Sequence, residues 1–301
     1  MAKTQITIID IARELNISPS TVSRALRNHP DISRKTVEIV KECAERLSYK
    51  PNEMALNLRL GRNNIIGVIV PEIVHYFFSS IVQGIEETAS AEGFNVMLFR
   101  SEESYEKELK ITESLINARV AGVLASLSKE TDRYEHYQQI LDNDIKLVFY
   151  DRICIGIITD RVVVDDYAGA LSAVEHLIST GCRRIAFYSS PLHLEISKNR
   201  RNGYLDALRK NSIPVDDPVE KSLRLVCDTR EKAMELTPHV LSLPEPPDSF
   251  FAINDHTATG ILYAVKKAGL RVPEDISICG FSGGDLALAC DPMLTTVEQH
   301  G

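Results

Sequence analysis

Hydroxyl and guanidinium side chains are concentrated in a short stretch near the N-terminus, SPSTVSRAL (18–26). Ser20, Thr21, Ser23 and Arg24 carry groups that hydrogen-bond to phosphate oxygens and to base edges. The Val, Ala and Leu residues of the stretch are spaced so that they share the inner face of a helix, while the polar residues point elsewhere. The stretch therefore has the chemistry of a nucleic-acid contact, although short polar residues at a helix start can also serve only as caps.

Neighbouring helices must position this stretch. The segment Thr7–Asp10 fits a capping box and predicts a helix that Asn16 ends. Ser18 can cap the next helix, and Pro19 suits its first position. A third helix is predicted from Ser33 to about Leu47. Two short helices with a tight turn form a helix-turn-helix, whose second helix can enter the major groove. The alternative is three amphipathic helices that only pack together.

Charge is unevenly distributed along the 301 residues. The whole chain has a net charge of −8, but residues 1–62 hold 11 Lys and Arg against 7 Asp and Glu, a net charge of +4. The remainder therefore carries −12. A basic head on an acidic body is the electrostatic footprint of a DNA-binding module, and the acidic body weakens indiscriminate binding elsewhere on the surface.

Composition is that of a globular protein, with 44% hydrophobic and 25% charged residues. No apolar run reaches the roughly 18 residues of a membrane span, and the N-terminus lacks the apolar segment of a signal peptide. We therefore expect a cytoplasmic protein without a membrane partner. The six cysteines form no CxxC pair and lie mostly in apolar runs, so we interpret them as reduced core residues.

Beyond Arg62, short apolar runs alternate with helical patterns. The runs IIGVIV (65–70), NVMLF (95–99), AGVLASL (121–127) and KLVFYD (146–151) are separated by helical patterns near 77–92, 104–118 and 131–143. The second half repeats this alternation. Apolar strands separated by helices indicate parallel sheets covered on both faces. The sequence thus predicts an α/β fold of two Rossmann-like subdomains, with a ligand cleft at the carboxyl ends of the strands.

Sequence motifs of common enzymes are absent. No GxGxxG opens a helix after the first strand, and there is no P-loop, no GxSxG and no HExxH. The Gly-rich GFSGGD (280–285) follows a late strand and lacks the required spacing. The sequence therefore predicts a protein that is not an enzyme, with no catalytic residues, no cofactor and no metal site.

The head and the segment after it resemble a known family in both order and spacing. IDIARELNISPSTVSRALRNHPDISRKT (9–36) and RLSYKPNEMALNLRLGR (46–62) are similar to the head and hinge of the LacI/GalR (lactose/galactose repressor) family of transcriptional regulators. This resemblance implies three parts. They are a helix-turn-helix DNA-binding domain in 1–50, a hinge helix and linker in 51–63, and an effector-binding domain in 64–301.

The resemblance also implies roles for matched positions in the head. A hinge helix in 52–60 would insert Leu58 between base steps and kink the duplex. Pro19 cannot donate a hydrogen bond, so its base contact would be apolar or shape-based. Base contacts fall to Pro19, Ser20 and Arg24, phosphate or other backbone contacts to Thr21, Ser23, Asn28 and Ser33, and the minor groove to Ala55, while Thr7, Ser18 and Asn52 complete the implied DNA-binding set.

The body is similar to the same family along essentially its whole length, from VPEIVHYFF (70–78) to PMLTTVEQ (292–299). This implies a periplasmic-binding-protein type of fold, and a homodimer that binds a pseudo-palindromic operator as a repressor. It also implies a small effector, a sugar or sugar derivative, bound between the subdomains. The implied effector-binding residues are Phe77, Phe78, Asp151, Arg200, Asn254, Asp255 and Ser282. Many family members carry an acidic residue at the last of these positions, and members usually continue beyond TTVEQHG with a helix and strands that this sequence lacks.

These side chains suit a small polar ligand. Phe77 and Phe78 can stack on a sugar or base ring, Asp151 can accept hydrogen bonds from hydroxyls, and Arg200 offers a planar donor fork. Each has an alternative without a ligand. The phenylalanines could be core residues, Arg200 could be solvated on a helix, and Asp255 could only cap one.

Two other function classes fit part of the sequence. A plain solute-binding protein would share the body, but the head and the missing signal peptide argue against it. An α/β enzyme with a DNA-binding head would need a catalytic constellation, which the sequence lacks. We therefore expect an effector-controlled DNA-binding regulator, with the effector, its sign of action and the operator sequence left open.

Overall fold

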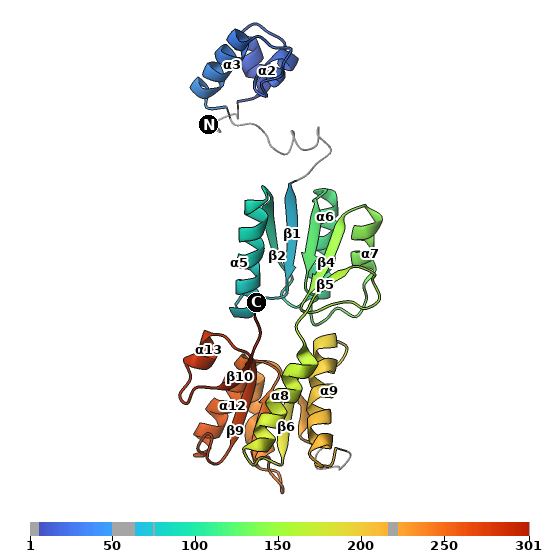
Figure 1. Ribbon diagram of the computed structural model, residues 1–301, viewed down its shortest axis with the longest axis vertical. Coiled ribbons are helices and arrows are strands. Elements are labelled where there is room, and N and C mark those ends of the chain that lie inside the picture. The colour runs from blue at the N-terminus through green and yellow to red at the C-terminus, as the bar shows by residue number, and fades with distance from the viewer. Residues whose placement is uncertain (1–5, 50–63, 75, 216–221, 301) are drawn as a thin grey trace. The chain divides into compact units, whose positions relative to one another are not determined.

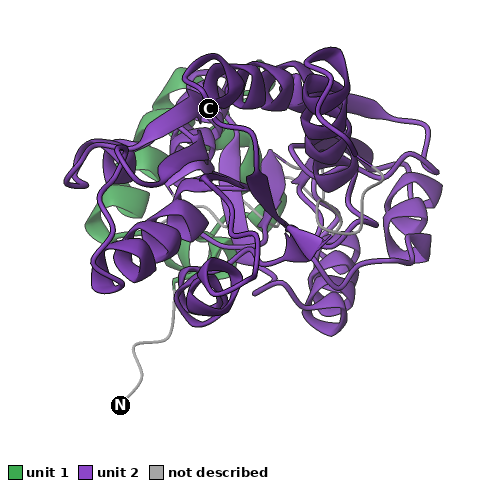
Figure 2. Cartoon of the chain, turned by 90° about the horizontal axis from the view of Figure 1, so that it is seen from below, with its two compact units in different colours: residues 1–63 green, residues 64–301 purple. Residues whose placement is uncertain are grey.

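The computed structural model describes residues 6–49, 64–74, 76–215 and 222–300. The chain divides into two compact units, residues 1–63 and 64–301 (Figure 2). The predicted hinge lies outside the described residues. Among the described helices, none is long and apolar enough to cross a membrane.

The first unit contains the three predicted helices, α1 (Ile8–Glu14), α2 (Pro19–Ala25) and α3 (Arg34–Arg46). The amide of Thr7 donates to Asp10 Oδ2 (2.9 Å), so the predicted capping box is present. Asn16 has a φ of 51°, which turns the chain after α1. The core of the unit consists of Ile11, Ala12, Val22, Ala25, Val40, Cys43 and Ala44.

The second unit contains two five-stranded parallel sheets (Figure 1). The first sheet has the order β2-β1-β3-β4-β5. Its strands are β1 (Ile65–Val70), β2 (Asn95–Arg100), β3 (Gly122–Ala125), β4 (Lys146–Tyr150) and β5 (Asp160–Val162). Its helices are α5 (Tyr76–Ala91), α6 (Tyr105–Asn117) and α7 (Glu135–Asp142). We call these elements the first subdomain.

The two faces of the first sheet bury different helices because successive strand residues point to opposite sides. Ile69 and Phe149 pack with Leu115 of α6 and Tyr137 of α7. The adjacent strand residues Val68, Val70 and Tyr150 pack with α5 on the other face. A sheet covered on both faces explains why the strands are almost uninterrupted apolar runs.

The second sheet has the order β10-β9-β8-β6-β7 and is built in the same way. Its strands are β6 (Ile185–Ser189), β7 (Arg224–Val226), β8 (Ser249–Ala252), β9 (Ser277–Ser282) and β10 (Thr295–Glu298). Its helices are α8 (Asp166–Ser179), α9 (Glu195–Lys210), α11 (Arg230–Leu241), α12 (Asp255–Lys267) and the short α13 (Asp285–Leu288). Phe187, Phe251 and Phe281 pack under α8 and α9, while Tyr188 and Phe250 pack under α11 and α12. We call these elements the second subdomain.

The predicted fold is confirmed: two parallel α/β subdomains follow a three-helix head. The six cysteines carry free thiols, and five of them are buried, as their apolar surroundings predict. The chain passes from the first subdomain to the second between β5 and α8. The loops that follow the carboxyl ends of the strands are the sites where ligands bind in open parallel sheets.

Candidate functional site

The predicted DNA-contacting residues of the head lie on its surface. Seven of them are exposed and two are half-buried. The exposed residues are Thr7, Ser18, Pro19, Ser20, Arg24, Asn28 and Ser33, and the half-buried residues are Thr21 and Ser23. The remaining three, Asn52, Ala55 and Leu58, lie outside the described residues.

Local hydrogen bonds organise the hydroxyls at the start of α2. Ser18 Oγ accepts from the amide of Thr21 (3.1 Å) and lies 2.7 Å from Ser20 Oγ. Arg27 donates to Ser23 Oγ (2.7 Å) one turn earlier on the helix. Arg24 is different, because within the described part of the head its guanidinium has no side-chain partner. This side chain is therefore available to a ligand such as a base edge.

All seven predicted effector-binding residues line one cleft between the two subdomains. They come from segments that are far apart in the sequence but lie at or near the carboxyl ends of strands. Phe77 and Phe78 begin α5, Asp151 follows β4, Arg200 is on α9, Asn254 and Asp255 begin α12, and Ser282 ends β9. Parallel sheets bring such positions to the same edge, which explains why separate motifs converge here.

Asp151 presents its carboxylate to this cleft. Its side chain is 6% exposed, and among the described residues none donates a hydrogen bond to it. The nearest cation is Arg152, whose Nε lies 3.9 Å from Asp151 Oδ2. Burial raises the pKa of Asp151 to about 6, although Arg152 and Arg200 oppose this shift. A buried acceptor that receives no hydrogen bond is a natural position for a ligand hydroxyl.

Arg200 is part of the cleft wall and not a solvated helix residue, since it is only 4% exposed. Its Nε donates to Asp166 Oδ1 (2.7 Å), and another guanidinium nitrogen donates to the carbonyl of Ile253. The guanidinium lies 3.7 Å from the centre of the Phe281 ring. These contacts fix the plane of the guanidinium. Burial raises the pKa of its partner Asp166, although the charge of Arg200 opposes that shift.

Asn254 and Asp255 have structural roles at the start of α12. Asn254 Oδ1 accepts from the amide of Thr257 (2.8 Å), so Asn254, not Asp255, caps the helix. Asp255 Oδ1 accepts from Thr296 Oγ1 (2.6 Å), and Oδ2 accepts from the amide of Gly283 (2.9 Å). Asp255 therefore anchors the loop after β9 to β10, with both carboxylate oxygens already engaged.

The aromatic residues divide between core and cleft. Phe78 is 4% exposed and packs with Val68 and Val70, so the core interpretation applies to much of its ring. Phe77 is only partly buried, and its ring lies edge-on to that of Phe78, with 5.5 Å between the centroids. Both residues line the cleft, and Phe77, the less buried of the two, also lines a second pocket beside Ile81 and Ile85.

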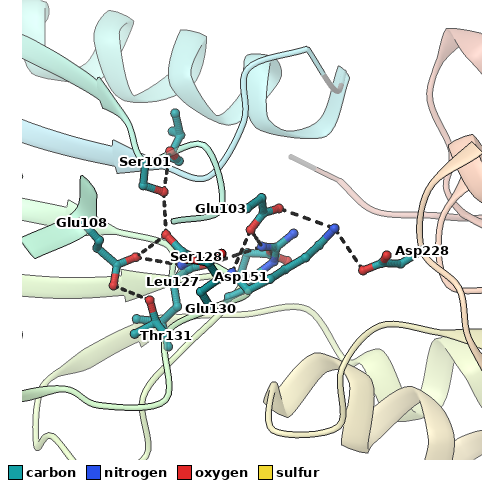
Figure 3. Close-up of polar contacts among 12 residues, drawn as sticks. Ser101, Glu103, Glu108, Leu127, Ser128, Glu130, Thr131, Asp151 and Asp228 are labelled. Carbon is teal, nitrogen blue, oxygen red and sulfur yellow. Dashed lines mark hydrogen bonds and ion pairs between the residues drawn. The ribbon is translucent and has the colours of Figure 1, made fainter. Parts of the chain in front are cut away.

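The sequence analysis missed a chain of charged side chains that crosses the cleft (Figure 3). Glu103 Oε2 accepts from Arg152 (2.7 Å) and from the amide of Lys129 (2.8 Å), all within the first subdomain. The Lys129 ammonium lies 3.0 Å from Asp228 Oδ2 in the second subdomain. The carbonyl of Lys129 also lies 2.6 Å from His193 Nε2 of the second subdomain. Polar residues directly after strands are the sequence signal that could have identified Glu103, Lys129 and Asp228.

A buried network holds the loop that carries Lys129. The carboxyl group of Glu108 on α6 is fully buried and accepts from the amide of Ser128 (2.8 Å) and from Thr131 Oγ1 (2.7 Å) (Figure 3). It also lies 2.9 Å from His136 Nε2. These bonds fix both ends of the segment 128–131, so the buried Glu108 network determines the position of Lys129.

Several residues at the rim of the cleft have unfavourable backbone angles. Glu102, Glu103 and Asp151 have φ values of 53°, 60° and 55°, in the left-handed region that favours glycine. Such angles cost of order 1 kcal/mol or more each and persist where the surrounding structure enforces them, often at ligand sites. Here they orient the carboxylates of Glu103 and Asp151 at the cleft.

Two family models match the chain. Residues 7–52 match the model described as bacterial regulatory proteins, lacI family. Residues 63–296 match the model described as periplasmic binding proteins and sugar binding domain of LacI family. The first match covers the helix-turn-helix head, and the second covers both subdomains around the cleft.

Curated relatives match the chain over almost its full length. Catabolite control protein A of Priestia megaterium is 31% identical over 297 residues, which cover 98% of this chain and 87% of the relative. The transcriptional repressor CytR of Escherichia coli K12 is 33% identical over 298 residues, which cover 99% of this chain and 86% of CytR.

Solved structures match in the same way. The Lac repressor dimer bound to operator and the anti-inducer ONPF gives a TM-score of 0.82 at 25% identity, covering 98% of this chain and 88% of that one. The transcriptional regulator CelR in complex with cellobiose gives 0.70 at 26% identity with the same coverage. A LacI family regulator from Enterococcus faecium with bound ribose gives 0.66 at 26% identity, covering 78% and 84%.

Proposed function

This chain belongs to the LacI family of bacterial regulatory proteins, and from that premise we propose that it is a homodimeric repressor controlled by a small effector. One observation carries this conclusion. Seven side chains assigned to an effector from separate sequence motifs all line a single cleft, in a chain that begins with a helix-turn-helix. Similar proteins have been solved with operator DNA, with cellobiose and with ribose.

The head supplies the DNA contacts in this proposal. α2 enters the major groove, where Arg24 donates to a guanine and Ser20 and Pro19 lie against neighbouring bases. Thr21, Ser23 and the remaining hydroxyls of the set contact phosphates. The dimer places two such helices on the two halves of a pseudo-palindromic operator.

The three-part organisation is also part of the proposal. The DNA-binding domain occupies 1–50, the hinge 51–63 and the effector-binding domain 64–301. In the hinge, Asn52 and Ala55 face the minor groove and Leu58 separates base steps.

The cleft couples the effector to the head because its walls belong to different subdomains. Asp151 lies on the first subdomain, and Arg200 and Asn254 lie on the second. A ligand that contacts both walls favours one relative arrangement of the subdomains, and the hinge helices of the dimer respond to that arrangement. A carbohydrate suits such a site because its hydroxyls both donate and accept hydrogen bonds.

The relatives are transcriptional repressors, and we propose that this chain likewise has no catalytic activity. We place it in the cytoplasm because the operator DNA that it binds is there.

Operator binding tests the proposal directly. A preferred duplex is selected from a random pool, and its dissociation constant is measured by fluorescence anisotropy with and without a panel of sugars, sugar derivatives and nucleosides. We expect a pseudo-palindromic preference and a changed affinity with at least one ligand. Ligand binding without DNA binding would indicate a solute-binding protein, and turnover of a panel member would indicate an enzyme.

A further inference from the structure

The cleft contains two carboxylates that need hydrogen-bond donors. Asp151 accepts no hydrogen bond from the described residues, although its side chain is 6% exposed. Asp228 Oδ2 is buried and also accepts none, because the Lys129 ammonium lies 3.0 Å away without the alignment of a hydrogen bond. A ligand that fills the cleft must therefore bring donors for both.

The cations of the cleft are already paired with protein carboxylates. Arg152 donates to Glu103 (2.7 Å), and Arg200 donates to Asp166 (2.7 Å). Lys129 lies 3.0 Å from Asp228 and 3.7 Å from Glu103. Among the described residues that line the cleft, Lys129, Arg152 and Arg200 face the four carboxylates of Glu103, Asp151, Asp228 and Asp255.

The imidazole at the cleft does not change the ratio of cationic to carboxylate side chains. His256 also lines the cleft, and burial lowers its pKa, so it is neutral at physiological pH. The described wall of the cleft therefore has a surplus of negative charge and of hydrogen-bond acceptors. An anionic ligand would add further acceptors and would compete with carboxylates for each cation.

We propose that the cross-cleft pair of Lys129 and Asp228 is an additional part of the effector site, and that it selects an uncharged, hydroxyl-rich effector over the corresponding sugar acid or sugar phosphate. This inference rests on the proposed function. A hydroxyl inserted between the two side chains accepts from the Lys129 ammonium and donates to Asp228. A neighbouring hydroxyl donates to Asp151, and the pairs of Arg152 and Arg200 stay intact.

A phosphate or carboxylate cannot make the same exchange. It accepts from Lys129 but donates nothing to Asp228 or Asp151, and it leaves the Asp228 carboxylate, whose side chain is 11% exposed, without its nearest counter-ion. Leaving a carboxylate with little access to water without its counter-ion is unfavourable, because neither solvent nor a cation then compensates its charge. Specificity then follows from the penalty that the site imposes on the anion, as well as from contacts to the neutral ligand.

The experiment uses the full chain and matched probes of one skeleton. The sets are glucose with glucuronate and glucose 6-phosphate, galactose with galacturonate and galactose 1-phosphate, ribose with ribose 5-phosphate, and adenosine with its monophosphate. Calorimetry and anisotropy with the selected operator give affinity and response. We expect a neutral member to bind at least about 100-fold more tightly than its anionic partners, which corresponds to roughly 2.7 kcal/mol.

Two variants identify the pair as the cause. Asp228→Asn removes the nearest counter-ion of the Lys129 ammonium and leaves it only the more distant Glu103 (3.7 Å), so the preference for the neutral member should shrink at least about tenfold, chiefly because the anionic member gains affinity. The matched control is Asp206→Asn on α9, which removes a surface partner of Arg209 (2.8 Å) in the same subdomain and should leave the preference unchanged.

Three outcomes would overturn the inference: an anionic member that binds better than its neutral partner, no neutral member that binds at all, or an Asp228→Asn variant with the wild-type preference. The first and third leave the proposed function standing if the ligand still changes operator affinity. Failure of the proposed function is recognised separately, by the absence of any selected operator.

Discussion

Arg200 on α9 donates through Nε to Asp166 Oδ1 on α8 at 2.7 Å, and both side chains are 4% exposed. The pair therefore holds the guanidinium in the cleft wall without help from a ligand. Such preorganisation reduces the entropy that a ligand must overcome on binding. The same pairing makes Arg200 part of the folding energetics of the second subdomain.

Arg200→Ala should therefore lower the free energy of unfolding as well as the response to effector. It leaves Asp166 buried and unpaired, which costs about 3–5 kcal/mol, whereas the added change Asp166→Asn should recover part of that loss. Arg201→Ala is the control, since adjacent helical residues face about 100° apart and the half-buried Arg201 has no carboxylate partner among the described residues, so a smaller loss is expected. Urea unfolding gives the stabilities, and calorimetry with the identified effector gives the affinities. Equal losses in the Arg200 and Arg201 variants would contradict this role.

The pKa of Asp151 predicts a specific pH dependence of stability. The folded protein holds this proton up to about pH 6, whereas an unfolded Asp titrates near its ordinary value of 3.8. The folded state binds more protons between these values, so the contribution of Asp151 to stability falls as pH rises through this window. Asp151→Asn should therefore gain stability relative to wild type at pH 7, by up to about 3 kcal/mol, and this relative gain should disappear near pH 3.5.

Asp275→Asn provides a control of opposite sign. Hydrogen bonds from Arg271 lower the pKa of Asp275 to about 2, so its stabilising effect is present at neutral pH and is lost as pH falls from about 4 to 2. Thermal unfolding at a series of pH values distinguishes the two variants. A pH profile of Asp151→Asn that runs parallel to wild type would show that burial does not shift this carboxyl.

The sequence predicted the fold for physical reasons, whereas the residues of the cleft were implied by the family resemblance. Strands buried on both faces are uninterrupted apolar runs, and this pattern predicted the two parallel sheets. Asp151 and Asn254 were implied by the resemblance, and each directly follows such a run, which agrees with a place at the carboxyl edge of a sheet. The predicted cap at Ser18 was equally local, because it needs only one side chain and an amide three residues later.

The charged residues that the sequence did not predict interact with partners far away in the chain, which no local sequence pattern reveals. Lys129 lies in a loop after β3, and its ion-pair partner Asp228 is almost a hundred residues later in the other subdomain. The sequence also did not show that both carboxylate oxygens of Asp255 accept hydrogen bonds, because the donors Gly283 and Thr296 lie in later segments of the chain. A sequence pattern can place a carboxylate at the edge of a sheet, but it does not show whether the carboxylate is free.

Arg24 is the long donor of α2 without a side-chain partner among the described residues, so its removal should change DNA recognition more than head stability. Arg24→Ala should remove about 1–3 kcal/mol of discrimination and relax the preference at one symmetric position in each half-site. Arg46→Ala is the control, because Arg46 is an exposed arginine of α3 that pairs with Glu14. Selection from a random duplex pool with each variant checks the point, and an unchanged base preference for Arg24→Ala would exclude Arg24 as a base contact.

Glu108 positions Lys129 through the segment 128–131, and its replacement should affect both stability and effector binding. Glu108→Ala removes the acceptor for the amide of Ser128, for Thr131 Oγ1 and for His136, all of them buried. Each buried donor left without a partner costs about 1–3 kcal/mol, so a total loss of several kcal/mol is expected in urea unfolding.

Glu108→Gln separates this positioning role from a general loss of stability. One amide oxygen can still accept from the Ser128 amide, while the Thr131 hydroxyl and the His136 imidazole can each reverse their hydrogen-bonding role to accept from the amide nitrogen. Glu108→Gln should therefore recover most of the stability, and with it the effector affinity and the preference for an uncharged ligand. Glu113→Ala, at an exposed position on the same helix, should change neither. If Glu108→Ala were as stable as Glu113→Ala, the buried network would not hold the loop. If Glu108→Gln regained stability but not effector affinity, Lys129 would be positioned by Glu103 alone.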